Sequence, residues 1–477
     1  MKETEKISTG VTGLDEILNG GLLPQKSYLL KGGPGTGKST FGYHFLERAL
    51  KNNESALYIT LGETRENIIG NAKQLGIDLS GVHFLDLTPD EDVYRNSRSY
   101  NVFTSAEVEQ EPIVESIVQA VEEHKPTCVF LDSITMLRTL NQDPFQMRNM
   151  ALSFIQFICR HATLLITSEA YEEKADKDAT FWVDGIIHLE YSTAWRKVSV
   201  SKYRGSDFSH GNHAFKINEK GVTVYPRLQA GNYERSYLSE PISTGIGELD
   251  QLLHGGLEKG TVTIISGPTG VGKTNFGIQF AKEAASRGER SAIYTFEESA
   301  EVLVKRSKAI NVPVQSMIEN GNLKITPVEP LSYSPDEFSS IVRKDVEEND
   351  TQIVIIDSVG GYGLSVREEN TLQRLHALTV YLQNMGVTTL LINETANVTG
   401  QFETTGMNAS YLADNIIFLR YLELDGELRK AIGVLKKRMS DFERAIREFD
   451  VTSDGLKVGK KMTNLRGILT GLPESTR

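Results

Sequence analysis

The chain has little cysteine and no long apolar run. Only Cys128 and Cys159 occur among its 477 residues, which excludes a disulfide framework and favours a reducing compartment. No stretch approaches the twenty or so apolar residues that a membrane-spanning helix needs, and no signal-peptide-like segment follows Met1. We therefore expect a cytoplasmic protein without membrane attachment, in which both cysteines are small buried side chains.

A strong charge of either sign is also absent. The formal net charge is −12, with 24% charged and 39% hydrophobic residues, a balance that excludes collagen-like and largely disordered chains. The acidic excess argues against a protein that wraps nucleic acid, although a local basic channel would still bind phosphate backbones. The length exceeds what one hydrophobic core usually serves, so we expect two domains.

The sequence repeats itself at a shift of 235 residues. Residues 8–15 (STGVTGLD) correspond to residues 243–250 (STGIGELD), and the glycine-rich segment near residue 35 corresponds to the one near residue 270. A repeat this long indicates a duplicated domain, because solenoid repeats are about 20–50 residues long. We predict domains at residues 1–228 and 242–477, joined by an extended linker at residues 229–241.

Short apolar runs alternate with longer amphipathic segments in both halves. Residues 128–131 and 353–356 are continuous apolar runs that end at an aspartate, and residues 164–166 and 389–392 have the same character. Fully apolar short strands separated by helices are typical of a parallel sheet that is covered on both faces. The predicted fold class is therefore α/β, with two tandem domains built on mainly parallel sheets.

Each half contains one match to the pattern G-x-x-x-x-G-K-[ST]. Its glycines let backbone N–H groups surround a polyphosphate, its lysine reaches the β- and γ-phosphates, and its hydroxyl residue binds Mg²⁺. We expect both loops to bind ATP with Mg²⁺. The residues concerned are Gly33, Pro34, Gly35, Thr36, Gly37, Lys38, Ser39 and Thr40 in the first half, and Pro268, Thr269, Gly270, Val271, Gly272, Lys273, Thr274 and Asn275 in the second.

Carboxylates complete the predicted sites. Asp132 and Asp357 end the apolar runs that follow the glycine loops, where a carboxylate would hold Mg²⁺ together with Ser39 and Thr274. Glu297 and Glu298 follow the next predicted strand of the second half, where one would accept a proton from the attacking group. The first half has only Glu63, because Gly62 occupies the position of Glu297.

Two cations recur after a strand-like run in each half, Lys202 with Arg204 and Lys436 with Arg438. Alternation on a strand places the two members of each pair on one face. Such a face would supply positive charge to the γ-phosphate bound by a neighbouring subunit, as an arginine finger does. An exposed edge strand explains the same spacing equally well.

Taken together, these motifs resemble the RecA-like P-loop ATPases and, within them, the KaiC family of circadian-clock proteins. The resemblance covers nearly the whole chain and includes residues 444–449 (RAIREF). It implies a double-ring homohexamer with ATP between subunits, a first domain that hydrolyses ATP and binds a KaiB-like thioredoxin-fold partner, and a second domain that phosphorylates, and can dephosphorylate, its own chain. It also implies that Glu63, Glu297 and Glu298 are catalytic and that the Lys-x-Arg pairs act across subunits.

Three features depart from that family. Gly62 removes one glutamate from the first site, which puts its hydrolysis rate in doubt. Ser410 and Tyr411 stand where neighbouring serine and threonine phosphoacceptors are usual, and Ser410 is the better acceptor because one pocket does not fit both hydroxyl positions. The sequence ends at Arg477, so we expect the longer tail that binds KaiA in clock members to be missing and do not expect KaiA as a partner.

The sequence thus predicts an Mg-ATP-dependent KaiC-like ATPase and serine/threonine autokinase. A RecA-type DNA-dependent motor is the first alternative, but residues 95–111 and 397–408 contain few of the cations that a DNA channel needs. A signalling scaffold that binds ATP without turnover is the second, and the retained glutamates argue against it. The residues do not separate circadian timekeeping from stress or other signalling.

Overall fold

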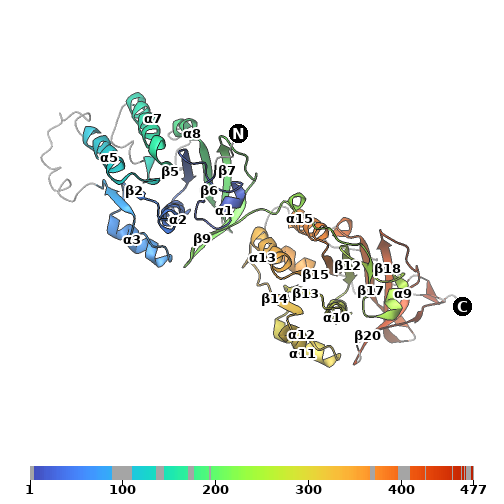
Figure 1. The fold of residues 1–477 in the computed structure, drawn as a ribbon. Helices are drawn as coiled ribbons and strands as arrows, with labels where there is room; N and C mark the ends of the chain where they lie inside the picture. The colour runs from blue at the N-terminus through green and yellow to red at the C-terminus, as the bar shows by residue number, and fades with distance from the viewer. Residues whose placement is uncertain are drawn as a thin grey trace. The chain divides into compact units, whose positions relative to one another are not determined.

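The computed structural model divides the chain into two compact units, Met1–Arg227 and Leu228–Arg477, which are described separately (Figure 1). Across its described part, no helix combines the length and apolarity needed to cross a membrane. The described residues are 5–88, 110–135, 144–169, 177–192, 195–365, 371–395, 409–424, 426–453, 455–463, 465–466, 468 and 474–475.

The first unit is built on a nine-stranded sheet. The P-loop strand β1 lies in its interior, between β5 and β6. In spatial order the strands are β3 (His83–Asp86), β2 (Ala56–Thr60), β4 (Cys128–Asp132), β5 (Thr163–Glu169), β1 (Ser27–Gly32), β6 (Gly185–Tyr191), β7 (Arg196–Tyr203), β8 (His213–Asn218) and β9 (Gly221–Tyr225).

The second unit repeats this sheet in the same order. Its P-loop strand β12 lies between β16 and β17. The strands are β14 (Leu323–Pro327), β13 (Arg290–Thr295), β15 (Thr351–Asp357), β16 (Thr388–Glu394), β12 (Val262–Gly267), β17 (Asn415–Leu424), β18 (Glu427–Lys437), β19 (Arg447–Thr452) and β20 (Gly455–Lys461).

Both sheets are parallel through their first six strands and antiparallel through the last three. The predicted α/β class with mainly parallel sheets is therefore confirmed. Each apolar run that the sequence marked as a strand belongs to an interior strand. The antiparallel extension at one edge was not predicted, since its strands alternate polar and apolar residues over short stretches.

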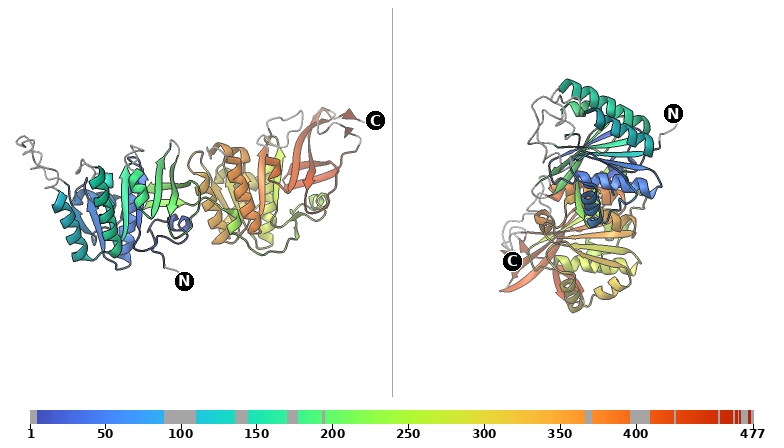
Figure 2. Two further views of the ribbon diagram at one scale, coloured as in Figure 1. Left: turned by 90° about the horizontal axis from the view of Figure 1, so that it is seen from above. Right: turned by 90° about the vertical axis from the view of Figure 1, so that its left-hand side faces the viewer.

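Helices cover both faces of each sheet (Figure 2). In the first unit, α2 and α3 lie on one face, and α5 and α7 on the other. The principal helices are α2 (Lys38–Lys51), α3 (Arg65–Gln74), α5 (Gln110–His124), α7 (Pro144–His161) and α8 (Lys177–Trp182), then α10 (Lys273–Ser286), α11 (Ala300–Ala309), α12 (Val314–Glu319), α13 (Pro335–Glu347), α14 (Val359–Ser365) and α15 (Thr371–Asn384).

Alternation along the strands builds two cores per unit. Tyr58 and Phe130 point to the core that contains α2, whereas Ile59 and Leu131 point to the core that contains α7. Because both faces are covered, neighbouring residues of one strand are buried on opposite sides. The P-loop helix packs closely, since a Cβ on Gly42 would lie 2.1 Å from the Phe130 ring.

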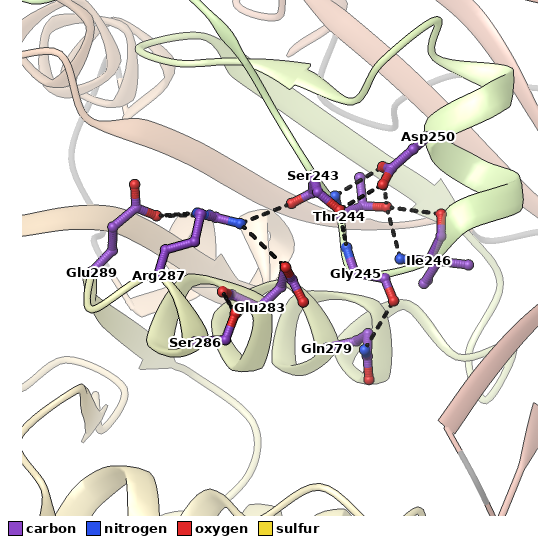
Figure 3. A network of polar contacts seen from close by, with 10 residues as sticks. All are labelled: Ser243, Thr244, Gly245, Ile246, Asp250, Gln279, Glu283, Ser286, Arg287 and Glu289. Atoms are coloured by element: carbon purple, nitrogen blue, oxygen red, sulfur yellow. Dashed lines mark hydrogen bonds and ion pairs between the residues drawn. The ribbon is translucent and has the colours of Figure 1, made fainter.

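The Ser-Thr-Gly segment of each repeat forms a loop held by an aspartate. In the second unit, Asp250 accepts hydrogen bonds from Ser243 Oγ (2.6 Å), Thr244 N (2.9 Å) and Thr244 Oγ1 (2.7 Å) (Figure 3). Asp15 receives the same three bonds in the first unit. This motif therefore has a structural role in both units, because it ties the loop to the short helix that follows it.

Residues 228–241 pack on the second unit. Leu228 joins its core, and the Tyr233 ring meets the Tyr381 ring edge-to-face at 5.1 Å. A 3₁₀ turn at Ala230–Asn232 interrupts the extended course predicted for this segment. The apolar contacts explain why the segment is ordered although it lacks helical or strand periodicity.

Candidate nucleotide sites

The glycine loops connect the central strand of each sheet to the helix that follows. α2 begins at Lys38 and α10 at Lys273. The residue before each lysine is a glycine in a left-handed conformation, Gly37 at φ 102° and Gly272 at φ 121°, which side-chain-bearing residues rarely adopt. In each loop the first five predicted residues thus lie between strand and helix and the last three form the first turn of the helix, so that backbone N–H groups gather at the helix N-terminus, as phosphate binding requires.

The loop lysines bend back over their own loops. Lys38 Nζ donates to the carbonyl oxygens of Gly32 (2.9 Å) and Gly33 (3.0 Å), and Lys273 Nζ donates to that of Pro268 (2.8 Å). Burial lowers the pKa of both ammonium groups, and nearby carboxylates partly oppose this shift. A buried ammonium group surrounded by backbone N–H donors is suited to a phosphate anion, which would replace the lost solvation.

A hydroxyl and a carboxylate meet beside each loop. Ser39 Oγ donates to Asp132 Oδ2 at 2.7 Å, and the Thr274 side chain is hydrogen-bonded to Asp357. Tyr58 and Thr167 also donate to Asp132, so its carboxylate is held by three hydroxyl groups. Such hard oxygen donors fit Mg²⁺, which uses few protein ligands and completes its shell with phosphates and water.

Other metal chemistry lacks a comparable set of ligands. Within the described ranges, no three His, Cys, Asp or Glu side chains cluster in a way that would hold a metal ion. Burial raises the pKa of Cys128 and Cys159 to about 11, so neither thiol has the thiolate character that metal binding or nucleophilic chemistry needs. The Ser/Thr–Asp pairs are thus the candidate metal sites among the described residues.

The second unit has an open cavity of about 240 Å³ over its glycine loop. It brings together loop, strand-end and helix residues that are far apart in the sequence. Its lining consists of Thr269, Gly270, Gly272, Lys273, Thr274, Asn275, Glu297, Glu298, Arg306, Asp357, Ser358, Ile392 and Glu394.

The two glutamates of this cavity are held differently. Ser358 Oγ donates to Glu297 Oε1 at 2.5 Å, whereas Glu298 Oε1 forms an ion pair with Arg306 Nη1 at 2.6 Å. Ser358 follows the metal-site aspartate Asp357 directly, and Arg306 lies on α11. Glu297 is therefore fixed by a neutral donor and Glu298 by a cation.

The first unit has only one of the two glutamates at the corresponding place. Among the described residues, the Glu63 carboxylate accepts one hydrogen bond, at 3.4 Å, from the side-chain amide of Asn71 on α3, and Gly62 carries no side chain. Asn71 lies eight residues after Glu63, as Arg306 does after Glu298, so the two positions correspond. The site with two glutamates has an arginine, and the site with one glutamate has an asparagine.

Asp357 is affected by this crowding of charge. Burial raises its pKa, the Thr274 hydrogen bond lowers it, Glu297 and Glu298 raise it further, and Arg306 lowers it. The Arg306 cation therefore favours the ionised form of Asp357, which is the form that a divalent metal requires.

The Lys-x-Arg pairs contact groups outside the glycine loops, and Lys436 and Arg438 are not among the residues that line the cavity of the second unit. Lys202 Nζ donates to the Thr180 carbonyl (2.7 Å) on α8, and Arg204 is exposed just beyond β7. Lys436 Nζ donates to the carbonyls of Ser410 (3.2 Å) and Ala413 (2.6 Å). The exposed Arg438 side chain pairs with Asp414 at 3.6 Å.

Both predicted phosphoacceptors are next to this second pair. Ser410 and Tyr411 lie in a 3₁₀ turn at Ala409–Tyr411, Tyr411 is 48% exposed, and its ring meets His376 at 5.7 Å. Neither belongs to the lining of the cavity in the same unit. The structure thus groups the acceptors with Lys436 and separates them from the glycine loop.

Three polar residues of the cavity escaped sequence reasoning, Arg306, Ser358 and Glu394, as did the apolar Ile392. Glu394 ends β16 and pairs in register with Gly267 at the end of β12, as Glu169 pairs with Gly32. The repeat itself contained this signal, because Glu169 and Glu394 end corresponding strands. Residues 95–109 and 397–408, whose few cations argued against DNA binding, lie outside the described residues.

Comparison with known proteins agrees with this geometry. The family described as "ATPase: KaiC" matches residues 7–229 and 242–463. Similar curated proteins include the circadian clock oscillator protein KaiC of Parasynechococcus marenigrum, 26% identical over 490 residues, and the circadian clock protein KaiC3 of Synechocystis sp., 27% identical over 488. The alignments cover 99% of this chain and 93% and 95% of those proteins.

Proposed function

The chain belongs to the KaiC family of ATPases, and from this premise we propose that it binds Mg-ATP in both domains, hydrolyses it in the first and transfers the γ-phosphoryl group to its own Ser410 in the second. The observation that carries the proposal is the cavity of the second unit, where Lys273, the Thr274–Asp357 pair and Glu297 line one space. These are the groups needed to hold a triphosphate and to accept a proton from an attacking hydroxyl.

Ser39 with Asp132, and Thr274 with Asp357, would hold Mg²⁺. When bound, the ion neutralises charge on the β- and γ-phosphates. Lys38 and Lys273 contribute a second positive charge to the same phosphates, and the loop N–H groups fix their orientation. Both sites need these functions, and both have the residues for them.

Glu297 is the proposed base for phosphoryl transfer. As the Ser410 oxygen forms its bond to the γ-phosphorus, the bond from that phosphorus to the β–γ bridging oxygen breaks, ADP leaves, and the serine proton passes to the Glu297 carboxylate. The hydrogen bond from Ser358 occupies Oε1, which holds the carboxylate in one orientation and leaves Oε2 for the proton.

Transfer is proposed to occur between subunits. Ser410 is not part of its own cavity lining, while Lys436 is bonded to the Ser410 backbone. An acceptor that carries its own cation on the edge of one subunit is suited to the nucleotide of a neighbour in a ring, and KaiC-family proteins typically form hexamers. Arg438, beside Lys436, and the pair Lys202 and Arg204 would serve the same purpose.

In the first domain, water replaces the serine hydroxyl. Glu63 is the proposed acceptor of its proton and works without a neighbouring glutamate. A KaiB-like partner on this domain, the absence of nucleic-acid binding and a cytoplasmic location stay predictions.

The proposal is tested by incubating the full chain with ATP labelled at the γ-phosphate and mapping the label. We expect label on Ser410, its loss in Ser410→Ala, and its retention in Tyr411→Phe. Glu297→Gln should slow labelling by about 10²- to 10⁴-fold, the range for removal of a general base. Label that survives unchanged in the Ser410→Ala/Tyr411→Phe double variant would refute the acceptor assignment.

A further inference from the structure

The two nucleotide sites differ at a pair of corresponding positions. Where the second site has Glu297, the first has Gly62, and where the second has Arg306, the first has Asn71. The remaining charged residues correspond one to one: Lys38 with Lys273, Asp132 with Asp357, Glu63 with Glu298 and Glu169 with Glu394. The second site therefore has one carboxylate and one cation more than the first.

These two additions leave the formal charge of the site unchanged. The lining of the second cavity holds four carboxylates and two cations, a formal charge of −2. The corresponding positions of the first site hold three carboxylates and one cation, again −2. Nucleoside triphosphates are polyanions, so an uncompensated extra carboxylate beside the glycine loop would weaken their binding.

The geometry fits a counter-charge inside the site. The Arg306 guanidinium lines the cavity and reaches Glu298 with Nη1 alone. Its Nε and Nη2, and Glu298 Oε2, are enclosed and make no hydrogen bond to any described residue. An arginine placed only to tie down a glutamate would be expected to use its two-pronged geometry, whereas here Nε and Nη2 keep their hydrogen-bonding capacity unused beside the cavity.

We propose that Arg306 is a positioning residue of the second site, which compensates the charge of Glu297 and thereby lets a two-glutamate site retain its affinity for nucleoside triphosphate. This rests on the proposed function in that it assumes a nucleotide in the cavity. It assigns no proton transfer to Arg306, which acts through the glutamates and through the potential at the glycine loop.

The test measures affinity for Mg²⁺ with the non-hydrolysable analogue AMP-PNP, in full-length chains whose first site is silenced by Lys38→Ala. Arg306→Gln should weaken binding about tenfold, and Arg306→Lys, which keeps the charge, should stay within about twofold of the parent. Glu297→Gln added to Arg306→Gln should restore the parent's affinity, because the formal charge returns to its original value.

A purely structural Arg306 would give a different result. Binding by the double variant would then be as weak as by Arg306→Gln, or weaker, and that outcome would overturn the proposal, as would unchanged affinity in Arg306→Gln. The readout is binding, so a protein that binds nucleotide but never labels Ser410 would disprove the autokinase and leave this inference standing.

The first site permits the converse test, with Lys273→Ala silencing the second. A Cβ on the exposed Gly62 would meet no atom within 4 Å, and its φ is not in the left-handed region, so the backbone accepts a side chain at this position. We expect Gly62→Glu to weaken AMP-PNP binding and Gly62→Glu/Asn71→Arg to restore it. Equal loss in the single and double variants would contradict charge compensation even if Arg306→Gln failed to fold.

Discussion

The two halves of this chain share one fold and differ in the chemistry that a few side chains provide. Both have a nine-stranded sheet with the same strand order, a glycine loop after the central strand and a hydroxyl–aspartate pair beside it. Only the second has a glutamate pair and an arginine. The comparison teaches that the two halves share the backbone suited to phosphate binding, whereas under the proposed function the residues after β2 and β13 would set the fate of the phosphoryl group.

The first prediction concerns the aspartates that hold the Ser-Thr-Gly loops. Asp15→Ala removes three hydrogen bonds to one carboxylate, and we expect the first domain to lose about 3 kcal/mol of unfolding free energy. Asp250→Ala should cost less, because Arg287 and Gln279 still bind the carbonyls of Ser243 and Gly245 (Figure 3).

Urea unfolding checks this with domain-specific probes. Both tryptophans, Trp182 and Trp195, are in the first unit, so their fluorescence reports that domain. Hydrogen exchange along β12 and β16 reports the other. Equal losses in the two variants would mean that the additional anchors of the second loop contribute nothing.

The two domains should also differ, by a smaller amount, in how their unfolding free energy depends on pH. His44 on α2 is buried, accepts a hydrogen bond from Val222 N at 2.8 Å, and has a pKa lowered by burial. Gln279 occupies the corresponding position in the second unit. As pH falls below about 6.5, the unfolded first domain takes up a proton that the folded one resists, so its stability declines by at most about 1.4 kcal/mol per pH unit.

His44→Gln should flatten this decline in the first domain, measured as urea midpoints by tryptophan fluorescence from pH 7.5 to 5. The second domain of the same chain, followed by hydrogen exchange along β12 and β16, serves as the control, since Gln279 does not titrate. An unaltered pH dependence in His44→Gln would assign the acid sensitivity to other groups, such as His188, whose pKa burial also lowers.

Much of the fold could be predicted because the duplication is explicit and the interior strands are continuous apolar runs. Residues 128–131 and 353–356 are strands for the same physical reason, burial on both faces. The edge strands β7–β9 and β18–β20 could not, because half-exposed strands mix polar and apolar residues and their pairing depends on contacts distant in sequence.

The site was predictable as far as local motifs extend. The glycine loops were recognisable from the spacing of their residues, and Asp132 and Asp357 from their place at the ends of apolar runs. Arg306 could not be found in this way, because a basic residue two turns into an amphipathic helix usually faces solvent, and only the fold brings it to Glu298. Likewise, the distance between Ser410 and its own cavity is a property of the sheet order, which no local pattern encodes.

The division of labour between the domains is tested most directly by comparing Glu63→Gln with Glu297→Gln in the full chain, using γ-labelled ATP and following free phosphate and protein-bound label together. We predict that Glu63→Gln suppresses phosphate release while the chain still becomes labelled, and that Glu297→Gln suppresses labelling while phosphate release continues. Loss of labelling in Glu63→Gln with its nucleotide affinity intact, or undiminished labelling in Glu297→Gln, would contradict the account.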